Sequence, residues 1–180
     1  MTEIECSAYV LEPRIIFSDD HHVIAAFDSV VVLIAGRPAT PDHVRMIDRT
    51  VRELVVKWPK GVSYIHVVDS LPGETRRIPD DTRKALVDLA KGAPPETRCV
   101  SITLLAEGFI AAAMRGVVAA ALAAFRFQVP LRVTSSVEET CFWVEQSYRK
   151  VGAPCPPARE LTNAITKLRD ELPARNKPKS

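Results

Sequence analysis

Residues 99–127 read CVSITLLAEGFIAAAMRGVVAAALAAFRF. The first seven form an apolar run typical of a strand, and residues 109–125 form a helix-like run whose only charge is Arg115. A strand this apolar is buried on both faces, and a helix this apolar must be covered by protein or lipid. Because the helical run is short for a bilayer, alanine-rich and charged near its middle, we interpret it as a buried helix of an α/β domain.

The region before this stretch predicts a hairpin followed by an amphipathic helix. Residues 14–17, 22–27 and 30–35 are strand-like, and Asp28-Ser29 signals a two-residue turn between the last two. Thr40-Pro41 begins a helix, because a hydroxyl at the N-cap and a proline at the next position favour helix initiation. Apolar residues then recur every three or four positions, which places one apolar stripe against the sheet.

The rest of the chain alternates strands and helices. Residues 62–68 are almost continuously apolar, which indicates a buried parallel strand, and 130–134 suit a sheet edge. A short helix begins near Pro79, another follows the capping-box pattern at Ser135-Ser136, and a last one spans about 158–172. This alternation predicts an α/β fold with one mixed, mostly parallel sheet and an N-terminal antiparallel hairpin.

We divide the chain into three parts. Residues 1–20 form an N-terminal extension, 21–151 form the α/β domain, and 152–180 hold a linker, a C-terminal helix and a basic tail. We expect the last helix to pack back on the domain rather than on a partner helix, because a helix this short is marginal alone.

Composition narrows the function classes. The 180 residues carry a net charge of only +2, so no global field attracts nucleic acid or an anionic membrane. The four cysteines are scattered without a C-x-x-C spacing, and the N-terminus lacks the pattern of a signal peptide. We therefore expect a cytoplasmic protein in a reducing compartment, with no nucleic-acid partner and no membrane span.

The order and length of these elements resemble the STAS domain, the fold of anti-sigma-factor antagonists and of the cytoplasmic ends of sulphate transporters. The resemblance covers about residues 20–151 and includes the alanine-rich third helix. In that family a serine after the third strand, in an Asp-x-Ser type segment, is phosphorylated by a partner kinase. Counted from the hairpin, the third strand here ends at Val68-Asp69-Ser70, but residues 71–78 intervene before the helical pattern resumes at Pro79. The resemblance implies a regulatory role.

The candidate contact residues follow the carboxyl ends of the predicted strands, where α/β proteins usually bind their ligands. Arginines near helix starts in these loops can hold a phosphate or a partner's carboxylate. The alternative is a set of ordinary surface loops, with Arg76 paired to Glu74 or Glu107. The candidate residues are Arg37, Asp69, Ser70, Arg76, Arg77 and Glu107.

The sequence predicts no catalytic residue, no metal site and no cofactor. His66 lies in a strand pattern, and we interpret it as a half-buried packing residue. His21, His22 and His43 are interpreted as too dispersed for a metal site. No phosphate-binding glycine motif and no hydrolase or zinc-protease motif occurs.

Three hypotheses of function follow. The first is a non-catalytic regulatory or scaffold domain that binds another protein through residues 69–78 and the second helix. The alternative is a small-ligand-binding protein or a small enzyme, with its pocket at the carboxyl ends of the strands. The third is a homo-oligomer assembled through the last helix or the N-terminal strands.

Overall fold

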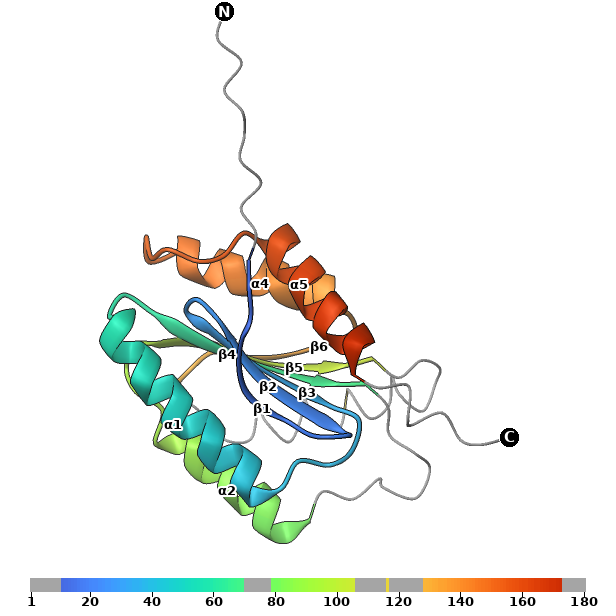
Figure 1. Ribbon diagram of the computed structural model, residues 1–180. Coiled ribbons are helices and arrows are strands. Elements are labelled where there is room, and N and C mark those ends of the chain that lie inside the picture. The colour runs from blue at the N-terminus through green and yellow to red at the C-terminus, as the bar shows by residue number, and fades with distance from the viewer. Residues whose placement is uncertain (1–10, 70–78, 106–115, 117–127, 173–180) are drawn as a thin grey trace, which may run out of the picture.

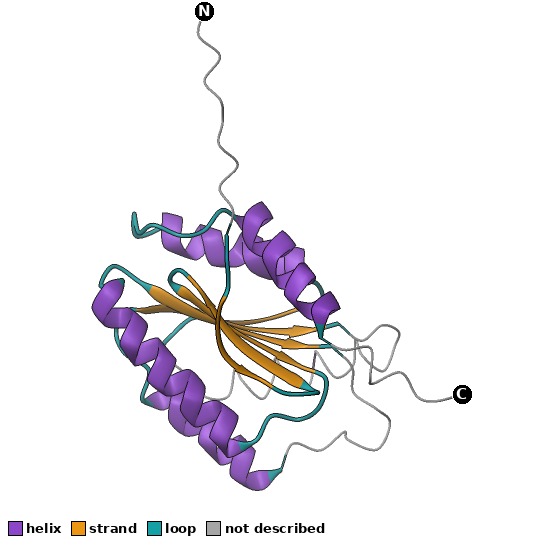
Figure 2. Cartoon of the chain, in the orientation of Figure 1, coloured by secondary structure: helices purple, strands orange, loops and turns teal. Residues whose placement is uncertain are grey.

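The structure is a computed structural model that describes residues 11–69, 79–105, 116 and 128–172. These residues form one six-stranded sheet between two helical layers (Figures 1 and 2). The strands lie side by side in chain order, β1 (Arg14–Ser18), β2 (His22–Phe27), β3 (Val30–Ala35), β4 (Val62–Val68), β5 (Thr97–Leu104) and β6 (Leu131–Thr134). One face carries α1 (Pro41–Lys57) and α2 (Asp80–Lys91), and the other carries α4 (Val137–Arg149) and α5 (Ala158–Glu171).

The first three strands are antiparallel. β2 and β3 pair from His22 with Ala35 to Phe27 with Val30, and the turn between them is Asp28-Ser29, as predicted. Asp28 has a positive φ of 50°, which aspartate tolerates better than most residues. β1 adds to the outer side of β2, with an irregularity between Ile15 and Phe17. The segment expected to be an N-terminal extension therefore contributes the edge strand.

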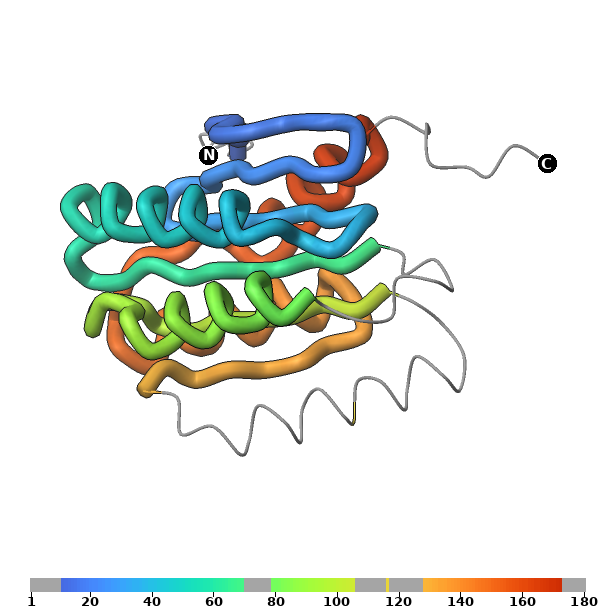
Figure 3. Tube along the Cα trace, turned by 90° about the horizontal axis from the view of Figure 1, so that it is seen from below, coloured from blue at the N-terminus to red at the C-terminus, as the bar shows by residue number. Residues whose placement is uncertain are grey.

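From β3 onward the strands are parallel, which confirms the predicted mixed sheet. Parallel neighbours joined by right-handed crossovers keep their connecting helices on one face. Accordingly α1 and α2 lie side by side across the same face of the sheet (Figure 3). The opposite face is covered by α4 and α5, which follow the last strand, and Leu11 before β1 joins the same apolar layer.

Two apolar layers result, and β2 and β3 are completely buried between them. Alternate residues of each strand enter opposite layers. The layer under α1 contains Leu33, Ile47 and Leu54, and the layer under α4 and α5 contains Ile34, Ile65 and Val144. The apolar runs of β2 and β3 match this burial, because strands covered on both faces are apolar at consecutive positions.

Two helices, α1 and α4, begin with a side-chain cap. Thr40 is the N-cap of α1 and Pro41 its first residue, as predicted. Ser136 is the N-cap of α4, and its hydroxyl accepts the Glu139 N–H at 3.1 Å. The Glu139 carboxylate in turn accepts the Ser135 N–H at 3.2 Å. The chain thus uses Ser136 rather than Ser135 as the cap.

The C-terminal helix packs on the domain, as predicted. Leu161, Ile165 and Leu168 of α5 lie in the same apolar layer as Tyr148 of α4. Cys99 and Cys141 are buried free thiols in this layer, and burial raises the pKa of the Cys141 thiol to about 11. They pack as small apolar residues.

The alanine-rich run at 109–125 lies outside the described residues except for Gly116. Gly116 is exposed, and a Cβ there would contact none of the described residues within 4 Å. No helix among the described residues is long and apolar enough to cross a membrane.

Two buried tyrosines allow a paired test of this core. The Tyr148 hydroxyl donates to the Ser29 carbonyl at 3.1 Å, whereas the buried Tyr64 hydroxyl has no partner among the described residues. Tyr148→Phe should lower the free energy of unfolding by about 1 kcal/mol, because it removes the hydrogen bond from the Tyr148 hydroxyl to the Ser29 carbonyl. Tyr64→Phe should be neutral or stabilising. Urea denaturation of both variants checks this, and an equal loss in the two would contradict it.

Candidate functional site at the carboxyl edge of the sheet

The carboxyl ends of β3, β4, β5 and β6 share one edge of the sheet. His22, the first residue of β2, lies at the same edge because it pairs with Ala35 at the end of β3. Of the predicted contact residues, Arg37 and Asp69 lie at this edge. Ser70, Arg76, Arg77 and Glu107 lie outside the described residues.

Asp69 connects this edge to the C-terminal helix. Its N–H donates to the Ala35 carbonyl at 3.0 Å, and its carboxylate lies 3.9 Å from the Arg169 guanidinium of α5. The Asp69 side chain is 43% exposed, so solvent screens this pair and it adds little stability. Arg37 is exposed, and its backbone carbonyl accepts a hydrogen bond from His22 Nε2 at 3.1 Å.

Three polar side chains from separate elements meet beside Arg37. Asp19 lies in the turn between β1 and β2, His22 begins β2, and His43 lies in the first turn of α1. One donor atom from each lies within 4.8 Å of the other two. The His22 and His43 ring centroids are 4.2 Å apart, and both residues are buried while Asp19 is exposed. We call these three residues the Asp-His-His cluster.

Asp19 is fixed by backbone hydrogen bonds. Its Oδ1 accepts the N–H groups of His21 and His22, each at 2.7 Å, and lies 3.2 Å from His22 Nδ1. Burial by itself would raise the pKa of the Asp19 carboxyl, but these bonds and the nearby His22 lower it below its ordinary value. Asp19 is therefore an anion held in one orientation.

His43 is both a cluster member and part of the helix cap. Its Nδ1 accepts the Thr40 N–H at 3.2 Å, while its own N–H points to Thr40 Oγ1 at 3.5 Å. Phe17 covers the ring, with centroids 5.1 Å apart. Burial, and then the neighbouring His22, lower the pKa of His43. A neutral His43 that accepts at Nδ1 carries its proton on Nε2.

His66 lies near the cluster on the α1 side of β4. It is half-buried, as predicted, and its ring lies 6.2 Å from that of Tyr64. Its Nε2 is buried without a hydrogen-bond partner among the described residues. Burial lowers the pKa of His66 to about 4, and the charges of His22 and His43 act in the same direction.

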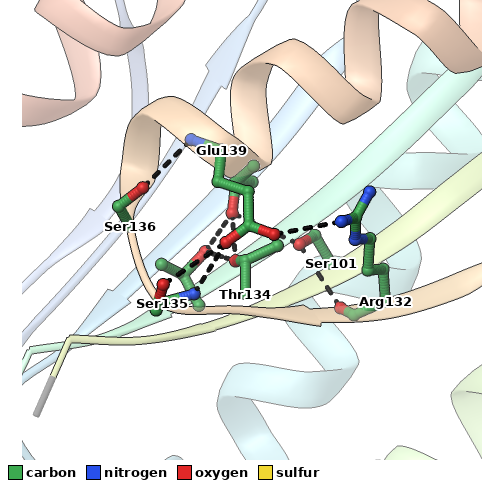
Figure 4. Close-up of polar contacts among 8 residues, drawn as sticks. Ser101, Arg132, Thr134, Ser135, Ser136 and Glu139 are labelled. Carbon is green, nitrogen blue, oxygen red and sulfur yellow. Dashed lines mark hydrogen bonds and ion pairs between the residues drawn. The ribbon is translucent and has the colours of Figure 1, made fainter.

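A second polar group lies where β5 and β6 meet α4 (Figure 4). The Thr140 hydroxyl lies 2.6 Å from that of Thr103 and also bonds that of Thr134, which donates to Thr103 at 3.2 Å. Arg132 pairs with Glu139 at 3.1 Å on the outer side of the group. Because these hydroxyls bond one another, the group serves to join the two strands to the helix.

The expectation that the histidines lie too far apart is wrong for His22 and His43. The predicted hairpin already contained a signal, because its register puts the start of β2 beside the end of β3. His43 follows that end by eight residues, in the first turn of the next helix. Whether the His22 and His43 rings meet then depends on where α1 crosses the sheet. Neither the spacing of the histidines in the sequence nor the apolar pattern of α1 specifies that position.

Comparison with known proteins adds no family to this description. No family model, curated protein or solved structure shows a significant match to the chain.

His66 predicts an acid-sensitive fold. The unfolded chain binds a proton at this histidine below about pH 6.5, but the folded chain binds it only below about pH 4. The stability contributed by neutral His66 is therefore complete above pH 6.5 and is lost as the pH falls toward 4. His66→Leu should reduce the loss of unfolding free energy between pH 6.5 and pH 4 by up to ~3 kcal/mol.

Urea denaturation of wild type and His66→Leu at several pH values measures this difference. Because His43 also has a lowered pKa, some acid sensitivity should persist in the variant. Identical pH profiles for the two proteins would contradict the assignment to His66.

Proposed function

We propose that the chain is a non-catalytic regulatory or scaffold domain, similar to STAS domains, that binds another protein through α2. The observation that supports this is the incomplete covering of α2. Thr82 is the only buried residue of this helix, whereas α1 in the same layer buries six. An apolar stripe that the described residues leave partly accessible is suited to a partner.

The position of α2 is nevertheless fixed at both ends. The Thr82 hydroxyl donates to the Ala39 carbonyl at 3.1 Å near the start of the helix. At its other end, the Arg52 guanidinium of α1 donates to the Gly92 carbonyl at 2.9 Å. Between these anchors Leu86 and Leu89 are half-buried. A rigid helix with accessible apolar residues loses little conformational freedom when a partner docks.

Charged residues surround this stripe. Arg83, Lys84 and Asp88 are exposed, and Arg83 pairs with Asp80 at 3.0 Å on the same helix. An apolar centre with a polar, charged rim is the usual composition of a protein interface. The proposed surface also includes residues 70–78, which precede α2 and contain Arg76 and Arg77. Their inclusion rests on the sequence alone.

A pair of charge-reversal variants tests the proposal. Arg83→Glu/Lys84→Glu changes α2, and Arg45→Glu/Arg49→Glu makes the same charge change on the exposed side of α1. In affinity capture from cells, we expect a protein partner that wild type and the α1 variant retain and the α2 variant loses by tenfold or more. Surface substitutions of this kind should leave both melting temperatures close to wild type.

Three outcomes would contradict the proposal. They are a partner captured equally by all three proteins, no protein captured by wild type, and loss of binding that accompanies unfolding of the α2 variant. Mass spectrometry identifies the partner, and a thermal melt of each variant monitors folding.

A further inference from the structure

We propose that the Asp-His-His cluster binds a divalent transition-metal ion of the zinc class. Two imidazoles and one carboxylate from three separate elements converge at one point, with donor atoms within 4.8 Å of one another. This donor set suits zinc and its neighbours in the first transition row rather than magnesium or calcium, which prefer oxygen ligands. This binding activity is independent of the partner surface on α2.

The spacing of the donors is close to what such an ion needs. In a tetrahedral site with bonds of about 2.0–2.1 Å, the ligand atoms lie about 3.3 Å apart. His22 Nδ1 already lies 3.2 Å from Asp19 Oδ1 and 3.3 Å from Asp19 Oδ2. His43 therefore makes most of the adjustment. Three protein ligands leave one tetrahedral position for water or another ligand.

His22 is oriented as a metal ligand would be. Its Nε2 donates to the Arg37 carbonyl at 3.1 Å, so when the ring gives up its Nδ1 proton to bind a metal ion, the freed lone pair faces Asp19. Metal-binding histidines usually donate their second N–H to a carbonyl or carboxylate in this way. Asp19 supplies the negative charge, and its side chain is 41% exposed, which gives an ion access from solvent.

His43 couples metal binding to the helix cap. A neutral imidazole has one lone-pair nitrogen, and Thr40 N–H occupies it at Nδ1. When a metal ion binds Nε2, the neutral ring carries its proton on Nδ1 instead. Nδ1 then no longer accepts the Thr40 N–H, and that hydrogen bond is lost. Metal binding should therefore change the amide of Thr40, a residue that is not itself a ligand.

Matched glutamine variants test the site in the tag-free, full-length chain. In His43→Gln the side chain can still accept from Thr40 N–H, because glutamine at this helix position is a standard capping-box residue. Its fold is thus supported while the metal ligand is lost. His22→Gln removes a second ligand, and His21→Gln changes the adjacent histidine outside the cluster. Zinc chloride is titrated into each protein by calorimetry.

We expect wild type and His21→Gln to bind one zinc ion per chain with affinities within twofold of each other. His43→Gln and His22→Gln should each bind at least tenfold more weakly, and His43→Gln, which keeps the helix cap, should melt close to wild type in the absence of zinc. Zinc should also raise the melting temperature of wild type, because an ion that binds only the folded state stabilises it.

The Thr40 amide gives an independent readout. In a ¹H–¹⁵N NMR titration its resonance should shift with zinc in wild type and stay unchanged in His43→Gln. No zinc binding by wild type, equal binding by His43→Gln, or an equally weakened His21→Gln would overturn the proposal.

Discussion

Strands β2 and β3 have every residue buried, and this two-sided burial constrains the rest of the structure. A hairpin this apolar needs a helical layer on each face. Right-handed crossovers between consecutive parallel strands place α1 and α2 on the same face. The other face is covered mainly by α4 and α5, which follow the last strand, through residues such as Tyr148 and Ile165.

The same hairpin brings polar groups together at one edge. Its register places His22 beside the end of β3, and the chain then passes through Arg37 into α1. The first turn of α1 therefore lies against the start of β2, and His43 contacts His22 there. The Asp-His-His cluster is thus a consequence of how the central hairpin connects to its first covering helix.

The two polar groups at this edge differ in how completely they are hydrogen-bonded. The hydroxyls of Thr103, Thr134 and Thr140 bond one another, as buried polar groups normally do. By contrast, His66 Nε2 near the Asp-His-His cluster has no hydrogen-bond partner in the described part of the chain, and His43 holds the Thr40 amide through its one available lone pair. The histidines of the Asp-His-His cluster and the nearby His66 are therefore better suited to proton transfer or ligand binding than the threonines, because they can change their protonation or their hydrogen-bond partner.

The sequence by itself determined the features that depend on neighbouring residues. These are the turn at Asp28-Ser29, the helix start at Thr40-Pro41, the α4 capping pattern and the apolar stripe of α5, and from their order the mixed sheet follows. Only the tertiary structure determined that His22 meets His43, that Asp69 lies near Arg169 and that α2 remains half-covered. Such contacts depend on where a helix crosses the sheet, and that is set by packing over the whole core rather than by local pattern.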